Sequence, residues 1–328
     1  MKIRSIFCAF LMTAIVQIGI FAQSADDFDV EQLANNTLKI TKYKGSVTDV
    51  VIPANLYGLP VTVIGKGAFS NTTGSIFITS VVIPDTVTII EERAFFGGEK
   101  NVPYEIDDKY YSGMGKLTRV SIGNGVRNIG RYAFSDNHEL TELNIPNSVV
   151  EIGESAFEHC GLTKLHLGNR LEHIGVNAFK GSGDMGLNGK SIQISGNNLT
   201  ELILPASLKT IGSNAFSNNQ LQSLIIPNGV VLVNSFAFDG NPITTLVIPA
   251  SLTRNVSPNT ADKNSSLITA GIGTCAFRCP INRITLPANA SEKMLTNALR
   301  ETSLINFFKS QNMAAGTYVK NGPIWSKE

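Results

Sequence analysis

The stretch LTELNIPNSVVEIGESAF, from Leu140 to Phe157, decides the fold because close copies of it recur along the chain. Clear copies open at Leu117, Leu162, Leu199, Leu221 and Ile243, looser ones at Val47 and Ile78, and a truncated one at Ile281. Where no insertion intervenes, consecutive copies start 22 or 23 residues apart. A fixed period of this size indicates a solenoid, in which each repeat forms one coil and packs only on its neighbours.

Each copy reads as one turn of such a coil. Inward Leu143 and Ile145 flank outward Asn144, as in a short β-strand, and Pro146 ends the strand because it has no N–H to donate. Gly153 is expected to relieve a bend, and an Ala-Phe pair closes the coil with one small and one large core group. The L-x-x-L-x-L wording at this period is typical of leucine-rich repeats.

The fold class predicted is therefore a leucine-rich repeat solenoid. Stacked coils should form a parallel β-sheet on one face and short turns or strands on the other, with a cap at both ends. The expected organisation is a signal peptide over 1–25, an N-terminal capping hairpin over 26–46, a solenoid of about nine repeats over 47–287 with insertions near 97–116, 180–198 and 253–271, and a C-terminal cap over 288–328.

The first residues resemble an export signal. Lys2 and Arg4 precede an apolar run from Ser5 to Phe21, and small residues follow before the acidic start Asp26-Asp27. Seventeen residues lie at the lower limit for a membrane span, so a cleaved signal is favoured over an uncleaved anchor. The expected location is the cell surface, the periplasm or the medium, with no transmembrane span left after the signal is removed.

The repeat wording L-x-x-L-x-I-P…V-x-x-I-G-x-x-A-F resembles the BspA-like class of leucine-rich repeats, from about Val47 to Pro287. On this resemblance, Asn36 to Pro53 is an N-terminal hairpin with Gly45 in its turn, Met294 to Phe308 is helical, and the segment from Gly316 to Trp325 is a closing strand pair. The resemblance also implies an exported or surface protein. Some members of the class bind host matrix or plasma proteins and other cells.

Outward strand positions form two ladders along the predicted sheet. The first reads Val51, Val82, Ser121, Asn144, His166, Ile203, Ile225, Val247 and Thr285. The second, two residues earlier, reads Asp49, Ser80, Arg119, Glu142, Lys164, Glu201, Ser223, Thr245 and Arg283. If this face is exposed, Ile203, Ile225 and Val247 make an apolar stripe of the kind that marks a partner site. The alternative is that these residues only satisfy β-propensity on a covered sheet.

The first insertion carries three of the seven tyrosines, Tyr104, Tyr110 and Tyr111. Tyrosines on a protruding loop bury much area with few rotamers to fix, so they are a second candidate partner site. The alternative is that they cover the flank of the solenoid itself.

No reaction chemistry is predicted. The G-x-G-x-x-G formed by Gly181, Gly183 and Gly186 lies inside an insertion instead of between a buried strand and a helix, and is expected to be a flexible loop. The four histidines occupy four different repeat positions and are expected to be scattered on the surface, and Cys160 is expected to be a small buried hydrophobe. The sequence therefore predicts no catalytic, cofactor or metal site.

Charge adds to these exclusions, because 27 basic residues balance 26 acidic ones, which argues against a nucleic-acid partner. Two functions remain open. The first is an exported, non-enzymatic binding or adhesion-type protein that presents a solenoid surface to a protein or glycan partner. The second is a structural or envelope-associated repeat protein without a specific soluble ligand.

Overall fold

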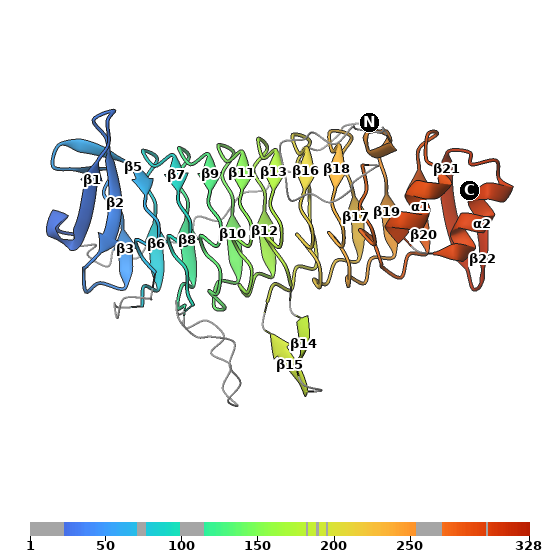
Figure 1. Ribbon diagram of the computed structural model, residues 1–328, viewed down its shortest axis with the longest axis horizontal. Coiled ribbons are helices and arrows are strands. Elements are labelled where there is room, and N and C mark those ends of the chain that lie inside the picture. The colour runs from blue at the N-terminus through green and yellow to red at the C-terminus, as the bar shows by residue number, and fades with distance from the viewer. Residues whose placement is uncertain are drawn as a thin grey trace, which may run out of the picture.

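A computed structural model describes residues 23–70, 77–98, 115–181, 183–187, 190–194, 196–253, 271–299 and 301–328. It is an elongated stack of coils in which two rows of short strands run along the molecule (Figure 1). The predicted leucine-rich repeat solenoid is confirmed. The signal-like segment at the N-terminus lies outside the described residues.

The more continuous row is a sheet of ten strands that reaches from the N-terminal end to the seventh full coil. From β5 to β18 its strands are parallel, and from β7 to β18 each is only two residues long. Its members in spatial order are β1 (Phe28–Gln32), β2 (Leu38–Tyr43), β5 (Leu59–Ile64), β7 (Ile89–Ile90), β9 (Asn128–Ile129), β11 (Glu151–Ile152), β13 (His173–Ile174), β16 (Thr210–Ile211) and β18 (Leu232–Val233), with β4 (Asn55–Leu56) beside β5.

The second row contains the L-x-I strands on which the prediction concentrated, and we call it the strand face. It is broken into three pieces. These are β3 (Asp49–Val51), β6 (Ser80–Val82) and β8 (Arg119–Ser121), then β10 (Glu142–Asn144) and β12 (Lys164–His166), and finally β17 (Ser223–Ile225), β19 (Thr245–Val247), β20 (Arg283–Leu286), β21 (Gly316–Asn321) and β22 (Ile324–Lys327). The segment 201–203 holds the strand position between β12 and β17 but forms no strand.

The core is a column of stacked phenylalanine rings, one from each coil. Consecutive ring centroids lie 4.8 to 5.6 Å apart, and the planes of neighbouring rings differ by at most 20°. The members are Phe69, Phe95, Phe134, Phe157, Phe179, Phe216, Phe238 and Phe277. The alternation of inward and outward residues in the sequence therefore produces one continuous hydrophobic core.

A buried asparagine follows several of these rings and satisfies the backbone where the coil turns. Asn219 Nδ2 donates to the carbonyl oxygens of Phe179 and Phe216 at 2.9 and 3.1 Å, and its Oδ1 accepts from Leu199 N at 3.0 Å. Cys160 takes the same place in its own coil, where its Sγ donates to Phe134 O at 3.2 Å. Cys160 is fully buried, as expected, and burial raises the pKa of its thiol far above the ordinary range.

The residue before each Ala-Phe pair adopts a left-handed backbone conformation. Its φ lies between 53° and 66° whether the residue is a glycine, an asparagine or a bulky side chain such as Tyr132 or Phe236. Gly153, which was expected to relieve a bend, is needed for the packing of neighbouring coils. A Cβ at Gly153 would lie 2.8 Å from Arg131 N, so the glycine is required by the close approach of the neighbouring coil.

At the N-terminal end, a short 3₁₀ helix (Ala25–Asp27) leads into the antiparallel pair β1–β2. The predicted hairpin over Asn36–Pro53 is placed too late in the sequence. The observed hairpin is formed by β1 and β2, and its turn lies before β2 and contains Asn36 in the left-handed region, at φ 58°. Gly45 is not in that turn. A Cβ there would lie 2.4 Å from the hydroxyl oxygen of Tyr43, so Gly45 makes room for a core side chain instead.

At the C-terminal end, two helices replace the single one expected over 294–308. They are α1 (Glu292–Leu299) and α2 (Thr302–Ser310), whose buried residues include Leu295, Leu304 and Phe308. The strand β21 pairs antiparallel with β20 and with β22, so β20, the last strand of the stacked coils, is not left as an open edge. A 3₁₀ helix (Ala250–Thr253) precedes the third insertion.

The second insertion contains a β-hairpin, not the flexible loop that was predicted. Its strands are β14 (Gly183–Leu187) and β15 (Lys190–Ile194), paired antiparallel from Gly183↔Ile194 to Leu187↔Lys190. The hairpin projects from one edge of the solenoid (Figure 1). Gly183 and Gly186 thus lie on a strand, and no helix N-terminus follows them as a dinucleotide site would require.

Candidate functional site

The outward positions of the strand face are exposed over most of its length. Ile203 and Ile225 expose 86% and 67% of their surfaces, which are large fractions for isoleucines. Val247 lies in β19 between β17 and β20 and is half-buried, in register with Ile225 and Thr285. The first two members of the predicted stripe are therefore open to a partner, and the third is only partly so.

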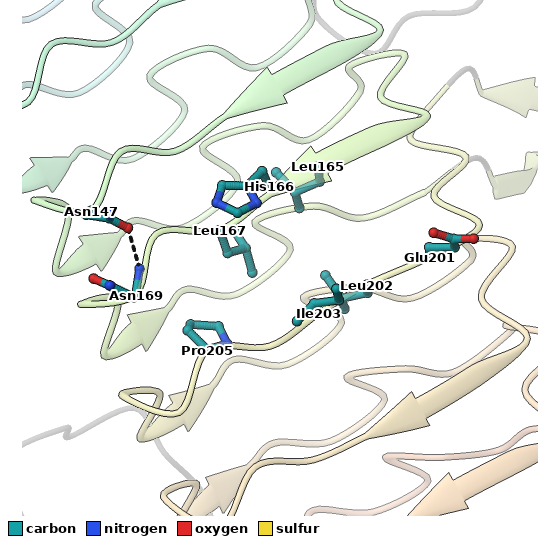
Figure 2. A pocket seen from close by; sticks show the side chains of 9 residues that line it. All are labelled: Asn147, Leu165, His166, Leu167, Asn169, Glu201, Leu202, Ile203 and Pro205. Carbon is teal, nitrogen blue, oxygen red and sulfur yellow. Dashed lines mark hydrogen bonds between the residues drawn. The ribbon is translucent and has the colours of Figure 1, made fainter. Parts of the chain in front are cut away.

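A groove adjoins this stripe where the strand face is interrupted (Figure 2). Its volume is about 470 Å³. The segment from Leu165 to Leu167 forms one side, and the segment from Glu201 to Ile203, with Pro205, forms the other. Asn147 and Asn169 lie at one end, where Asn169 N donates to Asn147 Oδ1 at 2.9 Å.

The groove exists because two neighbouring coils do not pair across the strand face. They are tied on either side of the interruption, by Asn198 N donating to Leu162 O at 2.8 Å and by Ser207 Oγ donating to Leu171 O at 2.7 Å. Between these ties, no β-pairing joins Lys164–His166 to the segment 201–203. The inward leucines of both segments, Leu165 and Leu202, are only half-buried.

The leucines at the same repeat position in other coils are buried more deeply. Leu143, Leu224 and Leu246 hold the same repeat position and are 2% exposed or less. The opening of the face therefore adds the partly exposed Leu165 and Leu202 to the apolar surface of Ile203. The sequence predicts the exposed Ile203 but not the groove, because Leu199 to Pro205 has the same sequence pattern as the coils that pair.

The charges of the strand face alternate along its middle. Lys164 Nζ lies 3.9 Å from Glu142 Oε2, and both side chains are about three quarters exposed. Among the described residues, neither Arg119 nor Glu201 forms an ion pair. At the N-terminal end, hydrogen bonds from Ser80 Oγ and Thr79 Oγ1 lower the pKa of Asp49, and the nearby Arg119 guanidinium acts in the same direction.

The second candidate site, Tyr104, Tyr110 and Tyr111, lies outside the described residues. The histidines do not converge, and the described part of the chain contains no group of three or more His, Cys, Asp or Glu that could hold a metal ion. They are not all on the surface, however. His138 is half-buried, and burial lowers its pKa.

His159 is half-buried as well. Burial opposes its protonation, but a 3.0 Å contact with Asp136 and the nearby carboxylates raise its pKa overall. His166 lines the groove, and His173 lies on β13 in the other sheet, with its Nδ1 2.9 Å from Thr210 Oγ1. Of the four histidines, only His166 belongs to the candidate surface.

Similarity to known proteins covers most of the repeat region. The family described as "BspA type Leucine rich repeat region" matches residues 36–103, 104–187 and 190–271, more than half of the chain. No enzyme family was detected. A search of curated proteins found no match. None of the described helices has the length and apolar character needed to cross a membrane.

Solved structures of bacterial leucine-rich repeat proteins are similar to the chain. One from T. pallidum is 24% identical, with a TM-score of 0.44, over 69% of this chain and 81% of its own. One from Bacteroides ovatus is 20% identical, with a TM-score of 0.49, over 70% of this chain and 60% of its own. A leucine-rich cell surface protein from Faecalibacterium prausnitzii is 22% identical, with a TM-score of 0.25, over 85% of this chain and 93% of its own.

The family match spans the same coils whose phenylalanines stack in the core and whose strands form the two rows. The chain belongs to the BspA-type leucine-rich repeat family.

Proposed function

We propose that this chain is an exported, non-enzymatic binding protein of the adhesion type, and that it presents the strand face to a protein partner. The observation that carries the proposal is the exposure of Ile203 and Ile225 on neighbouring coils, beside a groove of partly exposed leucines. Contiguous apolar surface with a polar rim is typical of protein interaction sites. Export is inferred from the signal-like residues before Asp26.

A protein partner is favoured over a glycan by the lining of the groove. No Phe, Tyr or Trp is among the residues that line it, so no aromatic ring is available there for a sugar to stack on. Leucine, isoleucine and proline side chains, with histidine and asparagine at the rim, suit the apolar core and polar rim of a protein interface.

The test replaces the two exposed isoleucines. Ile203→Ser with Ile225→Ser leaves the inward Leu204, Leu224 and Ile226 in place, so the fold should be kept. If each side chain contributes about 1–2 kcal/mol at an interface, the affinity for a protein partner should fall roughly ten- to a thousand-fold. The assay compares quantitative capture of extracellular proteins by the parent and by the variant, followed by titration of each captured protein.

A control makes the same kind of change at two exposed aliphatic residues elsewhere. Ile89 and Val176 are 42% and 39% exposed and lie off the strand face, so Ile89→Ser with Val176→Ser should bind like the parent. A partner retained equally by both double variants would show that binding uses another surface.

A further inference from the structure

Coils at equal distances on either side of the centre of the strand face carry complementary outward side chains. We infer that the protein partner this face fits is a second copy of the chain, packed face to face with the two solenoids antiparallel. The two-fold axis would run parallel to the strands, midway between β10 and β12. This inference rests on the proposed function and names the partner of the same surface.

Such an axis requires all coils to keep one register, and the described coils do. β10 and β12 pair with Glu142 opposite Lys164, and the other sheet pairs the same coils with Glu151 opposite His173. That sheet also continues the register through the coil that forms no strand on the strand face, because His173 pairs with Thr210 of β16. Coils at equal distances on either side of the axis therefore face each other across the two-fold.

Rotation about this axis brings opposite charges together. Glu142 faces Lys164 of the second copy, and Arg119 faces Glu201 of the second copy, so each contact forms twice. Arg119 and Glu201 are both exposed, and neither forms an ion pair among the described residues. In the second copy, each therefore faces an opposite charge with which it can form an ion pair.

The remaining charges do not oppose the arrangement. Asp49 would face Thr245, and it already accepts hydrogen bonds from Ser80 and Thr79. Arg283 lies beyond the facing coils and is held by Glu328, with an N–O distance of 2.6 Å. No like charges meet along either ladder, which is the condition for a self-complementary surface.

The apolar positions also match under the same rotation. Val82, which is 43% exposed, would face Ile225, and the half-buried Val51 would face Val247. Ile203, the most exposed, would face Ser121, whose small side chain leaves room for it. The pairs nearest the axis are polar, with Asn144 facing His166.

The size of the contact sets its expected strength. Eight coils at about 4.8 Å give a strip roughly 34 Å long, and a strand of three residues is roughly 10 Å wide. About 350 Å² per copy is less than half of the roughly 800 Å² of a standard interface. We therefore expect a weak dimer that forms with increasing concentration and dissociates with salt, since its charge pairs are exposed.

The decisive experiment exploits the two-fold relation of Arg119 and Glu201. The mature chain, Arg119→Glu and Glu201→Arg are each examined by sedimentation equilibrium over a range of concentrations at low ionic strength. Each variant alone places like charges together twice, so self-association should weaken by at least about tenfold. An equimolar mixture should associate again, because every contact between positions 119 and 201 joins opposite charges in the mixed dimer.

The control is Lys209→Glu, which makes the same change of charge as Arg119→Glu at an exposed position off the strand face. It should associate like the parent, and thermal melting should show that all variants remain folded. A parent that is monomeric at every concentration, or a mixture that associates no better than its components, would overturn the inference.

These outcomes are separate from the proposed function. If the chain is monomeric and the Ile203 and Ile225 double variant no longer binds some other protein, the second-copy inference is wrong. The proposal that the strand face binds a protein partner is then kept. If the mixture associates as described, the second copy is a partner of this face. If the chain is monomeric and the double variant loses no partner, both proposals are refuted.

Discussion

Replacing Phe157 by alanine should remove the central ring of the core column. Phe157 is fully buried, and its ring centroid lies 5.2 Å from that of Phe134 and 5.3 Å from that of Phe179, with all three rings nearly parallel. Its backbone contributes separately, since Phe157 N donates to Ala178 O at 2.9 Å and Phe157 O accepts from Asn197 at 2.8 Å. The substitution therefore tests the side chain and leaves the turn intact.

The expected cost is about 3–5 kcal/mol of unfolding free energy. The two ring contacts account for about 1–3 kcal/mol of it, at 0.5–1.5 kcal/mol for each stacked pair. Lost burial and the cavity account for the rest, because the neighbouring rings are held by their own coils and cannot close the gap. Such a loss is a large share of the 5–15 kcal/mol that typically stabilises a domain.

Guanidinium unfolding followed by circular dichroism measures the effect. A solenoid can lose its two-state behaviour when one interface is weakened, so the transition should be followed by a second probe as well. The matched control is Phe96→Ala. Phe96 is half-buried and contacts Tyr132 edge-on at 6.5 Å, so its loss should cost about 1 kcal/mol or less. A Phe157 variant as stable as the Phe96 variant would refute the register of the core.

Two further perturbations address the turns and the end of the stack. Asn219→Ala leaves the buried Phe179 O and Leu199 N–H without their partner, while Phe216 O keeps its hydrogen bond from Asn241. This should cost about 1–3 kcal/mol, whereas the exposed Asn228→Ala should change little in the same unfolding assay. Deletion of Met294–Glu328 removes most of α1 and all of α2, β21 and β22. It should cause aggregation in light scattering, because Leu286 and the edge of β20 become exposed. A deleted chain that stayed monomeric with an unchanged melting temperature would show that the tail is not a cap.

The core could be predicted from the sequence because stacking repeats one constraint in every coil. An inward position such as that of Leu143 contacts the same position of the next coil, so the same residue types recur and the period becomes visible. The left-handed residue before the Ala-Phe pair could not be found in this way. Tyr132 and Phe236 are residue types that disfavour positive φ by about 1–2 kcal/mol, and the packed coil imposes a conformation that their own preference opposes.

The second insertion carried a signal that the prediction missed. Asn188 and Gly189 lie outside the described residues, but they separate Leu187 from Lys190, the last pair of the hairpin. An Asn-Gly pair between two strand-like segments is a strong signal for a two-residue hairpin turn. The spacing of Gly181, Gly183 and Gly186 drew the interpretation toward a loop instead.

The interruption of the strand face had no such signal, and this bears on where function can be sought. Inward positions are fixed by the neighbouring coil, so Leu165 and Leu202 keep the residue type of the paired coils although their backbones do not pair with each other. Outward positions have no neighbour that fixes them, and a folded core does not require Arg119 on one coil or Glu201 on another. Stacking does not explain these charges or the exposed Ile203 and Ile225. Binding to a partner, such as a second copy, would explain why these residue types occur on the strand face.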